Sequence, residues 1–192
     1  YFQYEKNKHL LLAGLFTGLA MLSKYSGVFV WVGVGLYVII YARKEFKNPF
    51  LYLSVLISAV CMLPVLIWNL NNDFISFTFH GGRVGFFGDF HPEYFLTEII
   101  GELGYNNPVN YVLIIISLVA LIKGKNFIAD MPKRLILCLS LPLILLFWFF
   151  SLTREILPHW TAPSFVLLLI FVAAQLADKY EVKDENIIVP KS

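Results

Sequence analysis

The stretch that decides the fold is residues 10–41, LLLAGLFTGLAMLSKYSGVFVWVGVGLYVIIY. A helix rises about 1.5 Å per residue, so roughly 20 apolar residues cross a hydrocarbon core about 30 Å thick. The 32 residues of this stretch are too many for one crossing, and a single helix would place Lys24 in the middle of the bilayer. A lysine there costs about 2.5–3.5 kcal/mol on the insertion scale. We therefore predict two crossings joined by a hairpin turn over residues 23–27.

The composition extends this interpretation to the whole chain. Of the 192 residues, 58% are hydrophobic, 17% are aromatic and only 15% are charged. A soluble domain has about 45–50% apolar and about 25% charged residues. The predicted fold class is therefore all-α, a polytopic membrane helix bundle with about six transmembrane helices. The predicted spans are residues 8–23, 27–42, 50–69, 108–122, 135–152 and 161–177. Residues 1–177 form the predicted transmembrane bundle, which includes an outer loop over about 70–107, and residues 178–192 form a cytoplasmic tail.

Basic residues set the predicted orientation, because lysine and arginine in short loops are retained on the cytoplasmic side. With both termini placed on that side, 12 basic residues lie inside and 3 lie outside. The three outer ones are Lys24, Arg83 and Arg154.

Several classes of function have no support in the sequence. The net charge of +2 argues against a nucleic-acid partner, which needs a basic face. Cys61 and Cys138 both fall inside apolar runs, so we interpret them as small core residues. No P-loop, dinucleotide fingerprint or nucleophile elbow occurs in the sequence.

The three outer basic residues are candidates for a binding site. Lys24 lies in the hairpin turn, Arg83 follows two glycines, and Arg154 precedes the corner at residues 158–160. Fixed cations at this depth suit an anionic group, and arginine binds phosphate in a bidentate manner. The alternative is that each base pairs with a lipid phosphate or with a nearby acid; the acids in question are Asp73, Asp89 and Glu155.

Residues 92–103 of the outer loop have apolar residues at helical spacing, so we predict a short helix there. Its apolar stripe consists of Phe95, Ile99 and Leu103, and Glu98 and Glu102 are placed off the stripe. Such a helix suits the membrane surface. The other interpretation is a packed helix with no chemical role.

Histidines in the outer segments invite a metal interpretation. His80, His91 and His159 match no zinc spacing, and no HExxH or CxxC motif occurs. We therefore predict no metal site and no cofactor, although the spacing leaves a divalent metal open.

Gly14 and Gly18 form a small-xxx-small pair that lets a second helix approach closely. Ordinary packing inside the bundle is the simpler interpretation of this pair.

Three stretches, in succession, resemble one family of membrane enzymes. Residues 14–27, GLFTGLAMLSKYSG, resemble a hairpin of bacterial glycosyltransferases of the dolichyl-phosphate-mannose protein mannosyltransferase type, whose relatives include the aminoarabinose transferase acting on lipid A. Residues 64–69, PVLIWN, followed by 73–77, DFISF, and by Gly82-Arg83, are similar to a second stretch of these proteins. Residues 158–163, PHWTAP, resemble the start of a late span.

The chain departs from the family pattern at three positions. Phe74 replaces the usual tryptophan, His80 the usual glutamine and His159 the usual asparagine. The resemblance nevertheless covers nearly the whole chain in order.

The resemblance implies a membrane glycosyltransferase with a partial GT-C fold in the bacterial cytoplasmic (inner) membrane. Such an enzyme moves a sugar from a polyprenyl-phosphate donor to a glycan, lipid or protein acceptor on the non-cytoplasmic face. Family members carry their catalytic acid in a first outer loop near the N-terminus. We expect that loop upstream of Tyr1, which makes this chain a middle to C-terminal fragment that is inactive by itself.

The resemblance and the outer cations together give a set of expected substrate-binding residues: Lys24, Tyr25, His80, Arg83, Arg154, His159 and Trp160. Lys24 and Arg83 are expected to contact the phosphate, and the aromatic residues to shape the pocket for the sugar or lipid head. The alternatives are a membrane transporter and a non-catalytic membrane assembly subunit. Transporters usually place ionisable groups near the bilayer midplane, whereas the charges here lie at span boundaries.

Overall fold

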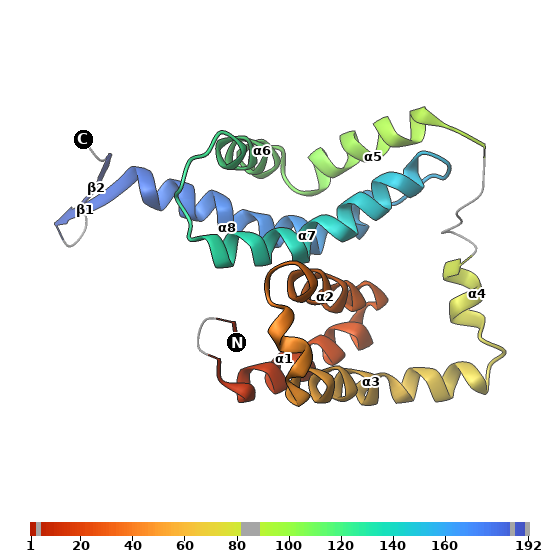
Figure 1. The fold of residues 1–192 in the computed structure, drawn as a ribbon. Helices are drawn as coiled ribbons and strands as arrows, with labels where there is room; N and C mark the ends of the chain where they lie inside the picture. Colours follow the sequence, from red (N-terminus) through yellow and green to blue (C-terminus); the bar gives the residue numbers. More distant parts are fainter. Residues whose placement is uncertain (3–4, 82–88, 185–186, 191–192) are drawn as a thin grey trace.

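The computed structural model describes residues 1–2, 5–81, 89–184 and 187–190, and Figure 1 shows a helical chain that ends in a short hairpin. The elements in order are α1 Asn7–Ser23, the 3₁₀ turn η1 Tyr25–Val28, α2 Phe29–Tyr41, η2 Arg43–Lys47, α3 Pro49–Leu70, α4 Ile75–Gly81, α5 Pro92–Tyr105, α6 Pro108–Ile122, α7 Asp130–Ser151, η3 Pro158–Trp160, α8 Ala162–Lys179, β1 Tyr180–Asp184 and β2 Ile187–Pro190.

The helical membrane bundle predicted from the sequence is confirmed, since a helix occupies each of the six predicted spans. Among the described residues, α3, α7 and α8 are each long and apolar enough to cross a membrane. Helices α5 and α6 meet that test only as a pair, and the pair is bent by 107°. The stretch Tyr25–Tyr41 is a shorter apolar helix. The number of six crossings stays a prediction.

Two of the helices begin at asparagine caps followed by proline. The Asn48 side chain accepts a hydrogen bond from the Phe50 N–H at 3.0 Å, and the Asn107 side chain accepts one from Val109 at 3.0 Å. Proline suits the first helical position because its missing N–H is not needed there. These caps fix where α3 and α6 start.

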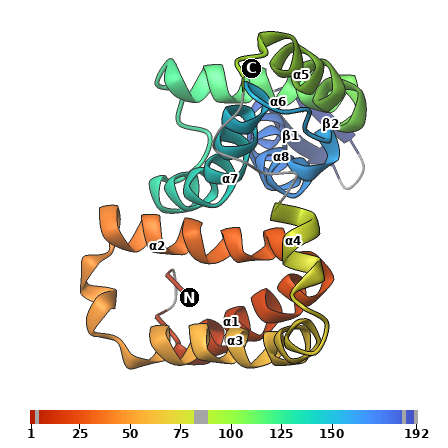
Figure 2. The same cartoon turned by 90° about the vertical axis from the view of Figure 1, so that its right-hand side faces the viewer.

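Helices α1 and α3 pack closely along the small-residue face of α1 (Figure 2). A Cβ on Gly14 would lie 2.8 Å from Ser54 Cα, and one on Gly18 would lie 2.9 Å from Ser58 Cα. The Ser58 hydroxyl donates a hydrogen bond to the Gly14 carbonyl at 2.5 Å. The glycine pair therefore serves helix packing inside this chain, which was the simpler interpretation.

Helix α2 joins the first three helices to the rest of the bundle. Figure 1 shows α1–α3 as one group and α5–α8 as another, with α2 beside α7. The approach is close, because a Cβ on Gly33 would lie 2.6 Å from both the Cys138 carbonyl oxygen and Leu139 Cα.

The main core lies between α6, α7 and α8. Its buried members are Tyr111, Ile114, Ile136, Ile144, Phe165, Leu168, Phe171 and Val172. Large apolar side chains elsewhere remain exposed, such as Phe16 at 64% and Leu56 at 58%. This distribution suits a bundle whose outer faces meet lipid rather than water.

Segments predicted to share one side of the membrane lie together in the structure. Lys44 forms a salt bridge with Glu5 at 2.6 Å, and the Arg134 guanidinium lies 4.9 Å from the centre of the Tyr41 ring. At the opposite end, the Tyr25 ring stacks on Phe77 at 5.8 Å. Which of the two ends faces the cytoplasm stays a prediction.

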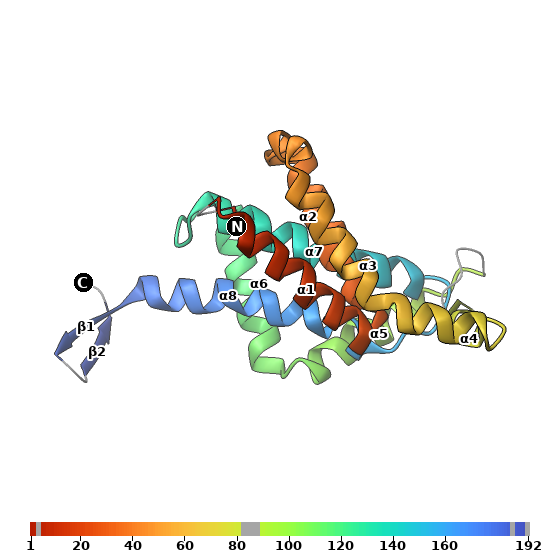
Figure 3. The same cartoon turned by 90° about the horizontal axis from the view of Figure 1, so that it is seen from below.

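The C-terminal segment contains structure that the sequence analysis did not predict. We expected a polar tail over residues 178–192. Instead α8 continues to Lys179, and β1 and β2 pair antiparallel with Tyr180 opposite Pro190 (Figure 3). The cytoplasmic location of this segment stays a prediction.

Candidate functional site

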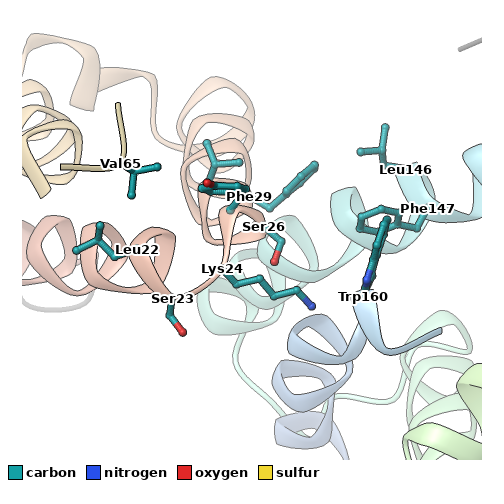
Figure 4. Close-up of a pocket in the computed structure, with 11 residues that line it drawn as sticks. Leu22, Ser23, Lys24, Ser26, Phe29, Val65, Leu146, Phe147 and Trp160 are labelled. Atoms are coloured by element: carbon teal, nitrogen blue, oxygen red, sulfur yellow. The ribbon is translucent and has the colours of Figure 1, made fainter. Parts of the chain in front are cut away.

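A cavity of about 630 Å³ opens at the end of the bundle that carries Lys24. We call it the Lys24 cavity. Its lining comes from four parts of the chain: the turn after α1 with Lys24 and Tyr25, Val65 of α3, Phe147 of α7, and Trp160 of η3. In Figure 4 the Lys24 side chain extends toward the side of the cavity formed by Trp160 and Phe147. The cavity thus places one ammonium group against mainly apolar walls.

The position of Lys24 follows from the turn predicted at residues 23–27, and the structure has a helix break there, between α1 and η1. Helix α1 ends because Lys24 is extended, with φ −153° and ψ 129°. The chain then turns against α1 at Gly27, where a Cβ would lie 2.7 Å from the Met21 nitrogen. A residue without a side chain is needed for this close approach.

The surroundings of Lys24 favour an anionic ligand. Lys24 is exposed to solvent as a whole, but the apolar walls beside it replace part of its hydration and so lower the pKa of its ammonium group. Within the described part of the chain, Lys24 forms no salt bridge. An anion that entered the cavity would therefore supply a partner for a charge that the protein has already partly removed from water.

A second cavity, of about 590 Å³, adjoins the first at Trp160. We call it the Arg154 cavity. Its lining is more polar and consists of Asp89, His91, Tyr94, Thr153, Arg154, Glu155, Leu157 and Trp160. Trp160 lines both cavities and meets the Phe147 ring at 5.4 Å. Carboxylates, an arginine and aromatic rings together are able to bind a hydroxyl-rich group.

The structure brings some of the predicted binding residues together. Lys24, Tyr25 and Trp160 line the first cavity, and Arg154 lines the second. His159 lines neither of these two cavities, and its ring instead lies 5.3 Å from that of Tyr105. The His80 side chain and Arg83 lie outside the described residues, so their predicted roles stay predictions.

The sequence analysis did not predict that two carboxylates of α5, those of Glu98 and Glu102, are buried. Glu102 is 0% exposed, and it accepts hydrogen bonds from the Thr161 hydroxyl at 2.6 Å and the Trp148 indole at 3.0 Å. Glu98 is 1% exposed, and neither carboxylate oxygen has a hydrogen-bond partner in the described part of the chain. Burial, together with the nearby charge of Glu102, raises the pKa of Glu98 to about 7.

The helix predicted at residues 92–103 is confirmed, and its predicted stripe of Phe95, Ile99 and Leu103 is partly buried. Glu98 and Glu102, which were placed off the stripe, are buried as well. Leu96 and Ile100 are the exposed residues, at 62% and 67%, while both glutamates face inward. The reason is that the buried Glu102 carboxylate is stabilised by hydrogen bonds from Trp148 of α7 and from Thr161, which precedes α8. The helix spacing itself carried no sign of these donors.

Metal ligands do not gather in the described part of the chain. No group of three or more His, Cys, Asp or Glu side chains there is placed to hold a metal ion.

Comparison with known proteins gives two matches. Residues 1–68 match the family described as dolichyl-phosphate-mannose-protein mannosyltransferase. The chain is also 24% identical over 161 residues to the lipid A galacturonosyltransferase RgtD of Rhizobium johnstonii. The aligned residues make up 81% of this chain and 33% of the relative. The chain thus spans about a third of the length of the curated relative it matches. No solved structure matches the chain.

These matches confirm the resemblance to GT-C glycosyltransferases that the sequence motifs indicated. The family match includes residues 14–27, the hairpin that carries Lys24. In sequence the chain is therefore similar to membrane glycosyltransferases of this type, and its structure contains several helices that are apolar and long enough to cross a membrane.

Proposed function

We propose that this chain is part of a membrane glycosyltransferase, which takes its sugar from a polyprenyl-phosphate donor and transfers it to an acceptor on the non-cytoplasmic face of the bacterial inner membrane. The observation that carries the proposal is the position of Lys24, an ammonium group on the wall of an apolar cavity at one end of the bundle. A lipid-linked donor has the matching shape, because its phosphate lies at headgroup depth and its tail lies in hydrocarbon.

The two adjoining cavities suit the two parts of such a donor. The Lys24 cavity would hold the phosphate and the first isoprene units, and the more polar Arg154 cavity would hold the sugar. A fixed cation near the phosphate stabilises the charge that develops when the sugar departs. Trp160, which lines both cavities, would lie beside the bond that breaks.

The acceptor in this proposal is a glycolipid. The relative from Rhizobium johnstonii is described as acting on lipid A. Because this chain covers 33% of that relative, the acceptor is proposed for the whole enzyme rather than for these residues alone.

The test is to titrate the detergent-solubilised protein with decaprenyl phosphate and to follow tryptophan fluorescence. Lys24→Ala removes the proposed phosphate contact. A hydrogen bond to a charged group is worth about 1.5–3 kcal/mol, so the dissociation constant should rise at least about tenfold. The matched control is Lys123→Ala, which removes an exposed lysine at the other end of the bundle and should bind like the parent.

Equal affinity in the Lys24→Ala variant and the parent would remove the Lys24 cavity from the mechanism. No binding by the parent would contradict the lipid-phosphate donor and favour the transporter or the assembly subunit.

A further inference from the structure

Glu102 connects four helical elements near the two cavities. It lies on α5, and its carboxylate accepts hydrogen bonds from Trp148 of α7 and from Thr161, the residue between η3 and α8. The Tyr111 side chain of α6 acts on the same carboxylate, because it opposes the rise in the pKa of Glu102 that burial causes. All of these contacts are buried, since Glu102 and Thr161 are both 0% exposed.

The contact with Thr161 fixes the turn that carries Trp160. The Thr161 hydroxyl lies 2.6 Å from Glu102 Oε1 and also 3.0 Å from the Pro158 carbonyl oxygen, so one side chain closes the turn and ties it to α5. Helix α5 itself approaches η3 so closely that a Cβ on Gly101 would overlap the Pro158 ring. Contacts with α5 therefore fix the position of η3.

We propose that Glu102 is a positioning residue, which holds the Pro158–Trp160 turn so that Trp160 forms the common wall of the Lys24 and Arg154 cavities. Glu102 lines neither of these two cavities and acts through Thr161. The effect of Glu102 on ligand binding rests on the proposed function, but its effect on the position of Trp160 does not.

The chemistry of the contact distinguishes Glu102 from other residues. The indole N–H of Trp148 only donates, whereas the Thr161 hydroxyl both donates and accepts. Glutamine can therefore accept from Trp148 and donate to Thr161, which preserves both contacts. Alanine makes neither contact.

The first measurement is fluorine NMR of protein labelled with 5-fluorotryptophan. The chain has four tryptophans, and Trp160→Phe assigns the Trp160 resonance. We expect Glu102→Ala and Thr161→Val to shift that resonance, and Glu102→Gln and Thr161→Ser to leave it near its parent position. The matched control is Glu98→Ala, which removes a buried carboxylate one turn earlier that has no hydrogen-bond partner in the described chain.

The second measurement is the affinity for decaprenyl phosphate. We expect Glu102→Ala to weaken binding about tenfold, because a displaced Trp160 loses contacts with the ligand and about 1.4 kcal/mol corresponds to a tenfold change in affinity. Thr161→Val should act to a similar extent. The double variant should be no worse than Glu102→Ala alone, because that single change already breaks the contact with Thr161.

A Trp160 resonance that stays in place in both Glu102→Ala and Thr161→Val would overturn the proposal. If Glu102→Ala fails to fold, the Thr161→Val and Thr161→Ser pair decides the same question from the other side of the contact. If the parent does not bind decaprenyl phosphate, the donor proposal fails, and the fluorine shifts still decide the role of Glu102.

Discussion

At the scale of single residues, Glu98 sets a pH dependence of stability. Its pKa is raised to about 7 in the folded protein, against 4.5 for a free glutamate, chiefly because of burial. Between these pH values the folded state holds a proton that the unfolded state has released. Stability therefore falls as the pH rises from about 4.5 to about 7 and stays lower above that range.

We predict that Glu98→Gln flattens this part of the profile, since glutamine has no charge to bury. Thermal unfolding in detergent, followed from pH 4.5 to 8, measures it. The variant should match the parent near pH 4.5 and unfold at a higher temperature near pH 8. Glu93→Gln is the control, because Glu93 is largely exposed and its pKa is lowered. Parallel profiles for Glu98→Gln and the parent would contradict the prediction.

The burial of the two glutamates could not be predicted from the sequence, for a physical reason. The hydrogen-bond partners of Glu102 are 46 and 59 residues away along the chain, so no local sequence pattern predicts them. Lys24 was different, because its position in a turn between two apolar blocks is a local property. Gly27 was predicted to be part of the turn because a turn between two apolar blocks is also a local feature of the sequence.

At the scale of elements, the contact between α2 and α7 depends on Gly33. A side chain there would enter the backbone of α7, because a Cβ already lies 2.6 Å from the Cys138 carbonyl oxygen. Gly35, two residues further along the same helix, has nothing within 4 Å of such a Cβ.

We predict that Gly33→Val destabilises the protein by about 1–3 kcal/mol, the usual cost of overpacking. For a chain of this size that lowers the melting temperature by roughly 2–12 °C. Gly35→Val is the matched control and should unfold near the parent temperature. Similar melting temperatures for the two variants would show that α2 and α7 do not pack as described.

The helices were predictable because each apolar block must satisfy its own backbone hydrogen bonds in lipid. The bend of 107° between α5 and α6 was not, since it depends on Asn107 with a positive φ of 62°. The pairing of β1 with β2 also escaped prediction, because the alternation of apolar and polar residues is confined to the short stretch 180–183 in a segment of mixed composition.

At the scale of the whole molecule, the orientation in the membrane decides whether the Lys24 cavity faces the proposed donor. The test uses single cysteines in a background where Cys61 and Cys138 are replaced by alanine. We predict that Asp73→Cys reacts with a membrane-impermeant maleimide in intact cells, and that Lys123→Cys reacts only after permeabilisation. Both parent side chains are exposed, so access to reagent is matched. The reverse labelling pattern would place the cavity on the cytoplasmic side and contradict the proposed function.

The pairing of α1 with α3 has a consequence for biosynthesis. These two helices are completed early, and they are able to associate while the ribosome is still translating the rest of the chain. The Gly33 face of α2 can pack against its partner only after α7 has left the translocon. During that interval, lipid or another protein must cover this face.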